Sequence, residues 1–351
     1  RSRVIFDNRC PSDVRNNLSC FKINGKAAST TTNCRVGIYL NGTVVFAAPK
    51  YPFIGYSGEQ YTGDEIALSA LGNTDLGVDA NAMRSFILRR GYMAVVASGA
   101  GQEGYTRVYV ADHEDLLVPV LPDALNRRVS SVHIKQWQYV SKKGWCSTKG
   151  DGSIASDMKK LGATWFYTWS ADRSCTDDAE YIPIRQHIWW PSVSQIGGHK
   201  SATACLMMNE PEHSEQHDNC DCKGVISEWN ACTYTPSMGK LGMRVGSPAP
   251  TDAGWLTNFI GHVDDMAYRC DFVAIHCYWG TNEAANAQAW KTKLQDIYNK
   301  TKRPIWITEW NNGANWTNES WPSSTSEKYE RQRKAIKEIV AMLESLDFVE
   351  R

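Results

Sequence analysis

Several features are missing from this 351-residue sequence, and each absence excludes a class of protein. Lys and Arg together number 38, as do Asp and Glu, and no long block of one charge occurs. The charge pattern therefore gives no support to a nucleic acid or an anionic membrane as partner. No apolar run approaches the roughly 20 residues that a membrane-spanning helix needs. No glycine-rich phosphate loop follows the first strand of the C-terminal part, which argues against a nucleotide-binding fold.

Tryptophan is absent from the first 136 residues, although the chain contains 14 of them. This break in composition predicts a domain boundary. We expect an N-terminal arm over residues 1–35, a β-rich accessory domain over 36–136 and a catalytic domain over 137–351.

Cysteine, in contrast, is abundant, with 11 residues. Six of them lie in two clusters: Cys10, Cys20 and Cys34, then Cys220, Cys222 and Cys232. This usage predicts disulfides and a secreted protein, and five Asn-x-Ser/Thr sites fit that environment. The alternative is a reduced protein with buried thiols. A zinc site is less favoured because the Cys-x-Cys pair has no second pair at the usual spacing, so we predict no metal and no cofactor.

The accessory domain has an antiparallel β pattern. Short apolar runs are separated by Gly, Asn and Asp, as in sandwiches and Greek-key folds. The strand candidates are Val36–Leu40, Thr43–Phe46, Glu65–Leu68, Ser85–Leu88, Tyr92–Val96, Arg107–Val110 and Ser130–Ile134. The order of short motifs resembles a βγ-crystallin Greek-key pair, with Leu71–Asn73 then Met83–Phe86 in one half, Leu125–Asn126 then Val129–Ser131 in the other, and Gly104 at a corner. A structural role for this domain is favoured over binding of sugar or calcium.

From Ser141 onward, strands alternate with helices. Buried parallel strands with intervening helices predict an α/β fold, either a (β/α)8 TIM-type barrel or an open doubly wound sheet. Seven strand candidates are present, and the eighth is not evident, because the chain stops at residues 347–350, where that strand would start. Either the protein continues further, or another segment such as Arg3–Phe6 closes the barrel.

Two of these strands end in a glutamate. The run Leu206–Met208 leads into Asn209 and Glu210, and the run Ile305–Thr308 leads into Glu309. The C-terminal ends of parallel barrel strands meet on one face, so both carboxyl groups are expected there. Glycoside cleavage with retention needs two such groups, one as proton donor and one as nucleophile. We expect the second carboxylate to raise the pKa of the donor.

Further residues at these strand ends suit a sugar substrate. Asn209 is placed to bond a hydroxyl beside the reacting carbon, and His276 and Tyr278 share one strand face, from which either could keep the nucleophile ionised. Tryptophan rings stack well on pyranose faces. The candidates for such stacking are Trp169, Trp279, Trp310 and Trp316, whereas Trp165 and Trp306 lie inside strands and are expected to be core residues.

These motifs together resemble clan A of the retaining glycoside hydrolases, and more narrowly glycoside hydrolase family 128, which contains β-1,3-glucanases. The matching stretches are Lys142–Trp145, Trp165–Trp169, Asn209–Pro211, Gly246–Pro248, His276–Tyr278 and Trp306–Trp310. The resemblance implies that Glu210 is the acid/base and Glu309 the nucleophile of an enzyme that hydrolyses internal β-linkages, with β-1,3-glucan as the first expectation. The alternatives are an endo-hydrolase of a β-1,4-linked glycan or an algal galactan, and a non-catalytic carbohydrate-binding protein. The sequence leaves the oligomeric state open.

Overall fold

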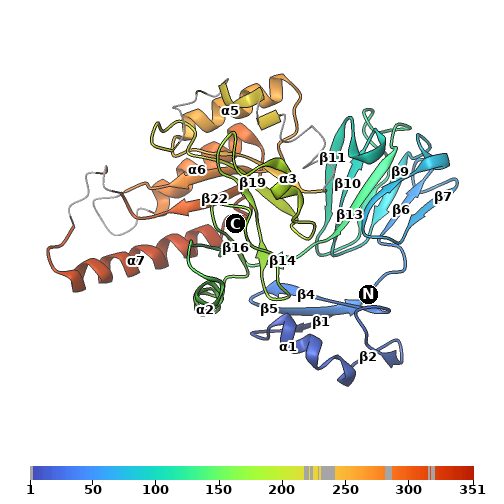
Figure 1. The fold of residues 1–351 in the computed structure, drawn as a ribbon, viewed down its shortest axis with the longest axis horizontal. Coiled ribbons are helices and arrows are strands. Elements are labelled where there is room, and N and C mark those ends of the chain that lie inside the picture. Colours follow the sequence, from blue (N-terminus) through green and yellow to red (C-terminus); the bar gives the residue numbers. More distant parts are fainter. Residues whose placement is uncertain are drawn as a thin grey trace. The chain divides into compact units, whose positions relative to one another are not determined.

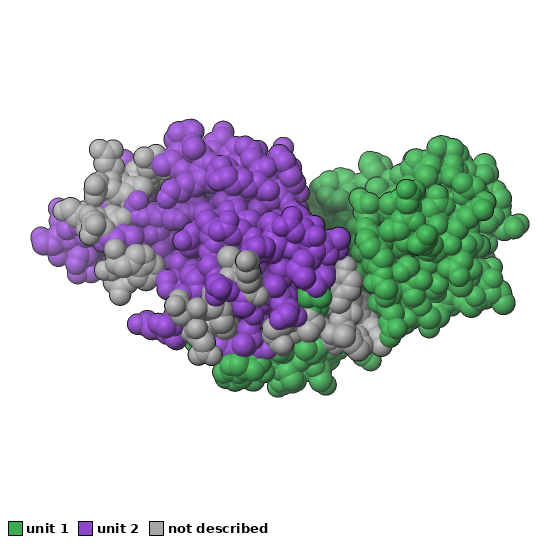
Figure 2. Space-filling model, turned by 90° about the horizontal axis from the view of Figure 1, so that it is seen from above, with its two compact units in different colours: residues 1–185, 189–205, 230–244 green, residues 186–188, 206–229, 245–351 purple. Residues whose placement is uncertain are grey.

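The computed structural model describes residues 3–216, 221, 224–227, 229–230, 242–280, 287–314, 317 and 321–351. The chain forms two compact units. Unit 1 holds residues 1–185, 189–205 and 230–244, and unit 2 holds residues 186–188, 206–229 and 245–351 (Figure 2). The boundary at residue 136 was inferred from tryptophan composition and stays a prediction. Within the described residues, no helix is both long and apolar enough to span a bilayer.

The N-terminal residues belong to a four-stranded sheet in unit 1. Its order is β1 (Arg3–Phe6), β5 (Gly42–Ala47), β4 (Cys34–Leu40) and β14 (Tyr139–Val140). Between β1 and β4 lie α1 (Pro11–Asn16), η1 (Leu18–Cys20) and the hairpin of β2 (Lys22–Ile23) and β3 (Lys26–Ala27). Because β1 pairs with β5 in this sheet, the prediction that Arg3–Phe6 could close a barrel is wrong.

The next eight strands of unit 1 form two four-stranded sheets (Figure 1). They are β6 (Phe53–Tyr56), β7 (Glu65–Leu68), β8 (Gly72–Asp75), β9 (Ser85–Leu88), β10 (Tyr92–Ala97), β11 (Thr106–Ala111), β12 (Leu116–Val118) and β13 (Ser131–Gln136), with short turns η2 (Gly77–Asp79) and η3 (Ala100–Gln102). The sheet orders are β12-β9-β6-β7 and β11-β10-β13-β8. Strand β8 therefore leaves β6, β7 and β9 to join the sheet of β10, β11 and β13, and β12 joins the sheet of β6, β7 and β9 in exchange. Buried side chains, including the stacked rings of Phe53 and Phe86, form the core. This exchange agrees with the Greek-key pair expected from the sequence.

Unit 1 also contains the first β/α elements. Strands β15 (Trp145–Cys146), β16 (Trp165–Tyr167) and β17 (Glu180–Tyr181) run parallel. Helix α2 (Asp151–Leu161) connects the first two and buries Ile154 and Met158 in one cluster with Phe166 and Tyr181. Strand β18 (Ile184–Arg185) and α3 (Val193–Gly197) follow. Trp165 is buried, as predicted.

Unit 2 continues the alternation. Its elements are the end of β19 (Ala204–Asn209), β20 (Arg244–Ala249), α5 (Ala253–Asp265), β21 (Val273–Cys277), α6 (Ala287–Thr301), β22 (Ile305–Trp310) and α7 (Thr325–Glu344). Strand β20 neighbours β19, a parallel bridge joins Gly246 to Phe272 beside β21, and β21 pairs in parallel with β22. Helix α6 packs against both α5 and α7 (Figure 1).

Residues 348–351 pair with β22. Val349 forms a parallel bridge to Ile305 of β22, and backbone bonds join Ile305 N to Phe348 O at 2.8 Å, Glu350 N to Ile305 O at 2.9 Å and Ile307 N to Arg351 O at 2.9 Å. Val349 and Arg351 are buried. Residues 348–351 therefore add a parallel segment on the far side of β22 from β21.

The predicted disulfides are not found in the part of the chain that the structure describes. None of its eight cysteines, which include the predicted candidates Cys10, Cys20 and Cys34, forms a disulfide with another described cysteine. Cys205 and Cys277 are fully buried core residues, the alternative that the sequence left open. The second predicted cluster, Cys220 to Cys232, lies outside the described residues.

Candidate active site

Strand β19 delivers Asn209 and Glu210. Its apolar residues are completely buried, which fixes the strand in the core. The backbone then departs from regular strand geometry, with φ of 46° at Met208 and 42° at Glu210. Such values are uncommon outside glycine and persist only where the surroundings enforce them. Here Asn209 N donates to Gln186 O at 2.9 Å and Glu210 N donates to Ala249 O at 3.0 Å.

The neighbouring strands β21 and β22 deliver the other two groups. Their parallel register shifts between Ile275 and His276, so that His276 lies opposite Glu309. In regularly paired strands the side chains alternate between the two faces of the sheet, and a register shift changes the direction of a side chain at that point. The imidazole of His276 is only 1% exposed, and Glu309 is 16% exposed.

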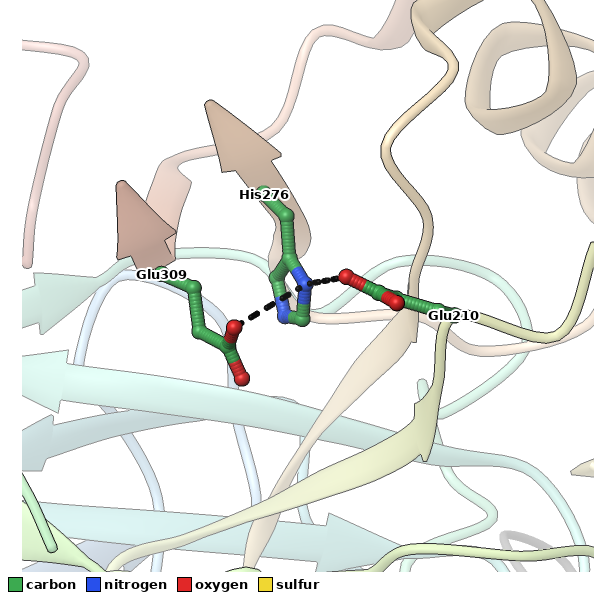
Figure 3. Close-up of side chains that lie close together, drawn as sticks. All are labelled: Glu210, His276 and Glu309. Carbon is green, nitrogen blue, oxygen red and sulfur yellow. Dashed lines mark hydrogen bonds and ion pairs between the residues drawn. The ribbon is translucent and has the colours of Figure 1, made fainter. Parts of the chain in front are cut away.

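Figure 3 shows His276 between the two glutamates. Its Nδ1 lies 2.6 Å from Glu210 Oε1 and 3.7 Å from Glu309 Oε2. The three groups each contribute one atom to a set in which all atoms lie within 4.8 Å of one another. The structure thus brings together Glu210, Glu309 and His276, as predicted from their strand ends.

The pKa of Glu210 differs from the expectation. Burial raises the pKa of this carboxyl, but the hydrogen bond and the positive charge of His276, with a further contribution from His213, outweigh burial and leave the pKa below its ordinary value. The raised pKa expected from the sequence assumes that Glu309 is the dominant neighbour. The imidazole of His276, 2.6 Å from Glu210 Oε1, instead reverses the direction of the shift.

Tyr278 acts on the other glutamate. Its hydroxyl donates a hydrogen bond to Glu309 Oε2. Of the two residues proposed to keep Glu309 ionised, Tyr278 makes the direct hydrogen bond, while His276 bonds primarily to Glu210.

Asn209 has an unused acceptor. The side chain is 5% exposed, and its Nδ2 donates to Gln216 Oε1 at 3.3 Å. Its Oδ1 is buried without a hydrogen-bond partner among the described residues. A buried polar atom without a partner is costly, and a ligand hydroxyl could satisfy it.

The tryptophan candidates have different outcomes. Trp279 lies just after strand β21, and Trp310 is the last residue of the adjacent strand β22. Both residues are half-buried. Trp169 lies in unit 1 with φ of 53° and packs edge-to-face on Tyr167. Trp316 lies outside the described residues, and Trp306 is a buried core residue, as predicted. The sequence analysis missed Trp290 of α6, which contacts both Trp279 and Trp310. Its position beside buried Leu294 on the inner face of an amphipathic helix was the available signal.

Within the described residues, a metal ion could be held by the group of Glu210, His276 and Glu309. Two ligands of one tetrahedral zinc ion lie roughly 3.3 Å apart, as follows from zinc–ligand distances of about 2.0–2.1 Å. The 2.6 Å separation of His276 Nδ1 and Glu210 Oε1 is instead a hydrogen-bond distance. Glu212, which follows in the loop, accepts bonds from Thr251 N at 2.6 Å and Thr251 Oγ1 at 2.9 Å and so has a structural role.

Comparisons with known proteins match the part of the chain that carries these residues. The profile of a family described as glycosyl hydrolase catalytic core matches residues 144–351. Among solved structures, a variant of a family 128 subgroup I endo-β-1,3-glucanase from Amycolatopsis mediterranei in complex with laminarihexaose is 27% identical, with a TM-score of 0.50, and the match covers 59% of this chain and 85% of that chain. A second structure of a variant of that enzyme is 28% identical, with a TM-score of 0.50 and coverage of 60% and 86%.

A third match concerns the N-terminal region. The N-terminal domain of protein S is 23% identical, with 24% of this chain and 94% of that chain covered, at a TM-score of 0.21. A score this low adds little, so the βγ-crystallin resemblance depends on the exchange of strands between the two sheets. No curated protein sequence matches the chain.

Proposed function

Because the chain belongs to the glycosyl hydrolase catalytic core family, that of glycoside hydrolase family 128, we propose that it hydrolyses internal β-1,3 linkages of a glucan with retention of configuration. Glu210 is the acid/base in this proposal, and Glu309 is the nucleophile. Both roles rest on the family motifs that these residues match.

One observation supports retention. One carboxylate oxygen of Glu210 and one of Glu309 lie within 4.8 Å of each other. Retaining enzymes hold their two carboxyl groups about 5–5.5 Å apart, whereas inverting enzymes need roughly 6.5–9.5 Å to admit a water. The space between Glu210 and Glu309 suits a direct attack on the sugar.

The proposed reaction has two steps. Glu309 attacks the anomeric carbon while Glu210 protonates the leaving glycosidic oxygen, which gives a covalent glycosyl-enzyme and releases one sugar chain. Glu210, now a carboxylate, takes a proton from water while the water oxygen bonds to the anomeric carbon and the bond from that carbon to Glu309 breaks. Tyr278 donates a hydrogen bond to Glu309 Oε2 and so orients the nucleophile for the attack. His276 Nδ1, which lies 2.6 Å from Glu210 Oε1, holds in place the carboxyl group that delivers the proton.

Several features support a β-glucan as substrate. The first solved structure named above was determined with laminarihexaose. The unpartnered Oδ1 of Asn209 offers an acceptor to the hydroxyl beside the reacting carbon, and Trp279 and Trp310 offer indole surface. We also propose that the catalytic domain is an eight-stranded barrel, in which residues 348–351 belong to the eighth strand. We further propose an extracellular location, because polysaccharide substrates occur outside the cell.

The test is hydrolysis of laminarin, mixed-linkage glucan, cellulose and agarose by the wild type, by Glu309→Gln and by Glu210→Gln. We expect wild-type cleavage of laminarin, with oligosaccharides of several lengths as early products and a β-anomer formed first in the proton NMR spectrum. Both variants should lose activity. If another glycan is cut and laminarin is not, the substrate assignment is wrong. A first-formed α-anomer would refute retention, and single glucose units as the sole early product would refute internal cleavage.

A further inference from the structure

Trp290, on α6, joins the two candidate sugar-stacking residues. Its ring centroid lies 5.3 Å from that of Trp279, at an interplanar angle of 74°, and 5.8 Å from that of Trp310, at 81°. Both contacts are edge-to-face, the arrangement that aromatic rings prefer. Trp290 is 1% exposed, so it cannot itself touch a substrate.

Trp290 fixes the backbone as well as the ring of Trp279. Its indole Nε1 donates to Trp279 O at 3.0 Å. A second residue of the same helix also reaches Trp279, because Lys293 Nζ lies 4.9 Å from the centroid of its ring. Strands β21 and β22 position the Cα atoms of Trp279 and Trp310, but α6 restrains the Trp279 ring.

Restrained side chains bind with a smaller loss of entropy. Each side chain that a ligand must immobilise weakens binding, and a side chain that is already held avoids this loss. Trp279 and Trp310 share one buried neighbour, so a change in that neighbour disturbs both together.

We propose that Trp290 is a positioning residue that holds Trp279 and Trp310 as one preformed platform for a β-glucan chain. This inference rests on the proposed function and deepens it. The platform recognises sugar units beyond the cleaved bond. Its loss therefore weakens the binding of long oligosaccharides and leaves short ones and the chemical step nearly unchanged.

The test compares Trp290→Phe with a matched control, Trp229→Phe. Trp229 is also fully buried in unit 2, donates its indole N–H to Gly246 O at 2.9 Å and packs edge-to-face on Phe259. Kinetics are measured with laminaritriose and laminarihexaose. We expect Trp290→Phe to raise KM for the hexaose about fivefold to tenfold, the effect of losing restraint on one or two side chains. Its KM for the triose and its kcat should stay within about twofold of the wild type, as should all constants of the control.

Equal KM values for the two Trp→Phe variants at both chain lengths would overturn the positioning role, with the proposed function intact. A wild type that neither cleaves nor binds any laminari-oligosaccharide would overturn both.

If Trp290→Phe does not fold, the same inference is tested through Trp279→Ala and Trp310→Ala. Their effects on KM for the hexaose should be non-additive in the double variant, since both rings depend on one support. Strict additivity would refute the shared platform.

Discussion

Replacing His276 by Phe should raise the pKa of Glu210. The substitution removes the partner at 2.6 Å, while burial, which raises the pKa, remains. A hydrogen bond to a charged group contributes about 1.5–3 kcal/mol. Without it, burial is no longer outweighed, so we expect the pKa of Glu210 in His276→Phe to lie above the wild-type value. The ring of Phe fits the site because His276 is a buried aromatic side chain.

The assay is a titration of protein labelled with carbon-13 at the glutamate carboxyl carbons, followed by NMR and assigned with Glu210→Gln. His276→Gln serves as a graded variant, because it keeps a neutral donor and should give a smaller shift. An unchanged or lowered pKa in His276→Phe would show that the imidazole does not control Glu210.

The same contact has a consequence for stability. A carboxyl group whose folded pKa is lowered stabilises the fold above its unfolded pKa, and this contribution is lost as the pH falls through the folded value. The difference in unfolding free energy between wild type and His276→Phe should therefore be larger at pH 7 than at pH 3, in urea denaturation. A difference that is constant with pH would contradict the direction of the Glu210 shift.

Three further predictions concern other parts of the molecule. Tyr278→Phe removes the hydrogen bond to Glu309 and should lower kcat/KM by about 10- to 100-fold, from the strength of a bond to a charged group, with a melting temperature near that of the wild type. Deletion of residues 348–351 removes three backbone hydrogen bonds to β22, one to Leu346 and the buried side chain of Val349, and should destabilise the fold by on the order of 5 kcal/mol in chemical denaturation. Thiol titration of the unfolded, unreduced protein should detect at least five thiols, those of Cys10, Cys20, Cys34, Cys270 and Cys277, which form no disulfide in the described structure.

The sequence was sufficient to locate the two glutamates. Completely buried apolar runs such as Leu206–Met208 have few alternatives to a central strand, and a carboxyl group directly after the run must lie at its end. The alternation of strands and helices then placed Glu210 and Glu309 on the same face. The same reasoning predicted strands such as Glu65–Leu68 and Ser85–Leu88, whose bounds match β7 and β9.

Elements without a strong apolar pattern were missed. Strand β8 (Gly72–Asp75) has no buried residue, and its place depends on pairing with β13. Trp290 was overlooked for a related reason. Its role depends on which residues of β21 and β22 face α6, and helical periodicity alone shows only that it points inward.

The partner of each glutamate depended on backbone irregularities that no residue pattern reveals. With regular alternation, His276 and Tyr278 would both face Glu309, as the sequence analysis assumed. The register shift at Ile275 and His276 and the positive φ at Met208 and Glu210 change this, so that Glu210 meets the imidazole while Tyr278 bonds Glu309. A positive φ at such residues costs of order 1–3 kcal/mol, and bonds from Glu210 N to Ala249 O and from Asn209 N to Gln186 O hold it in place. The strained backbone therefore gives the two carboxyl groups different hydrogen-bond partners, the imidazole of His276 for Glu210 and the hydroxyl of Tyr278 for Glu309.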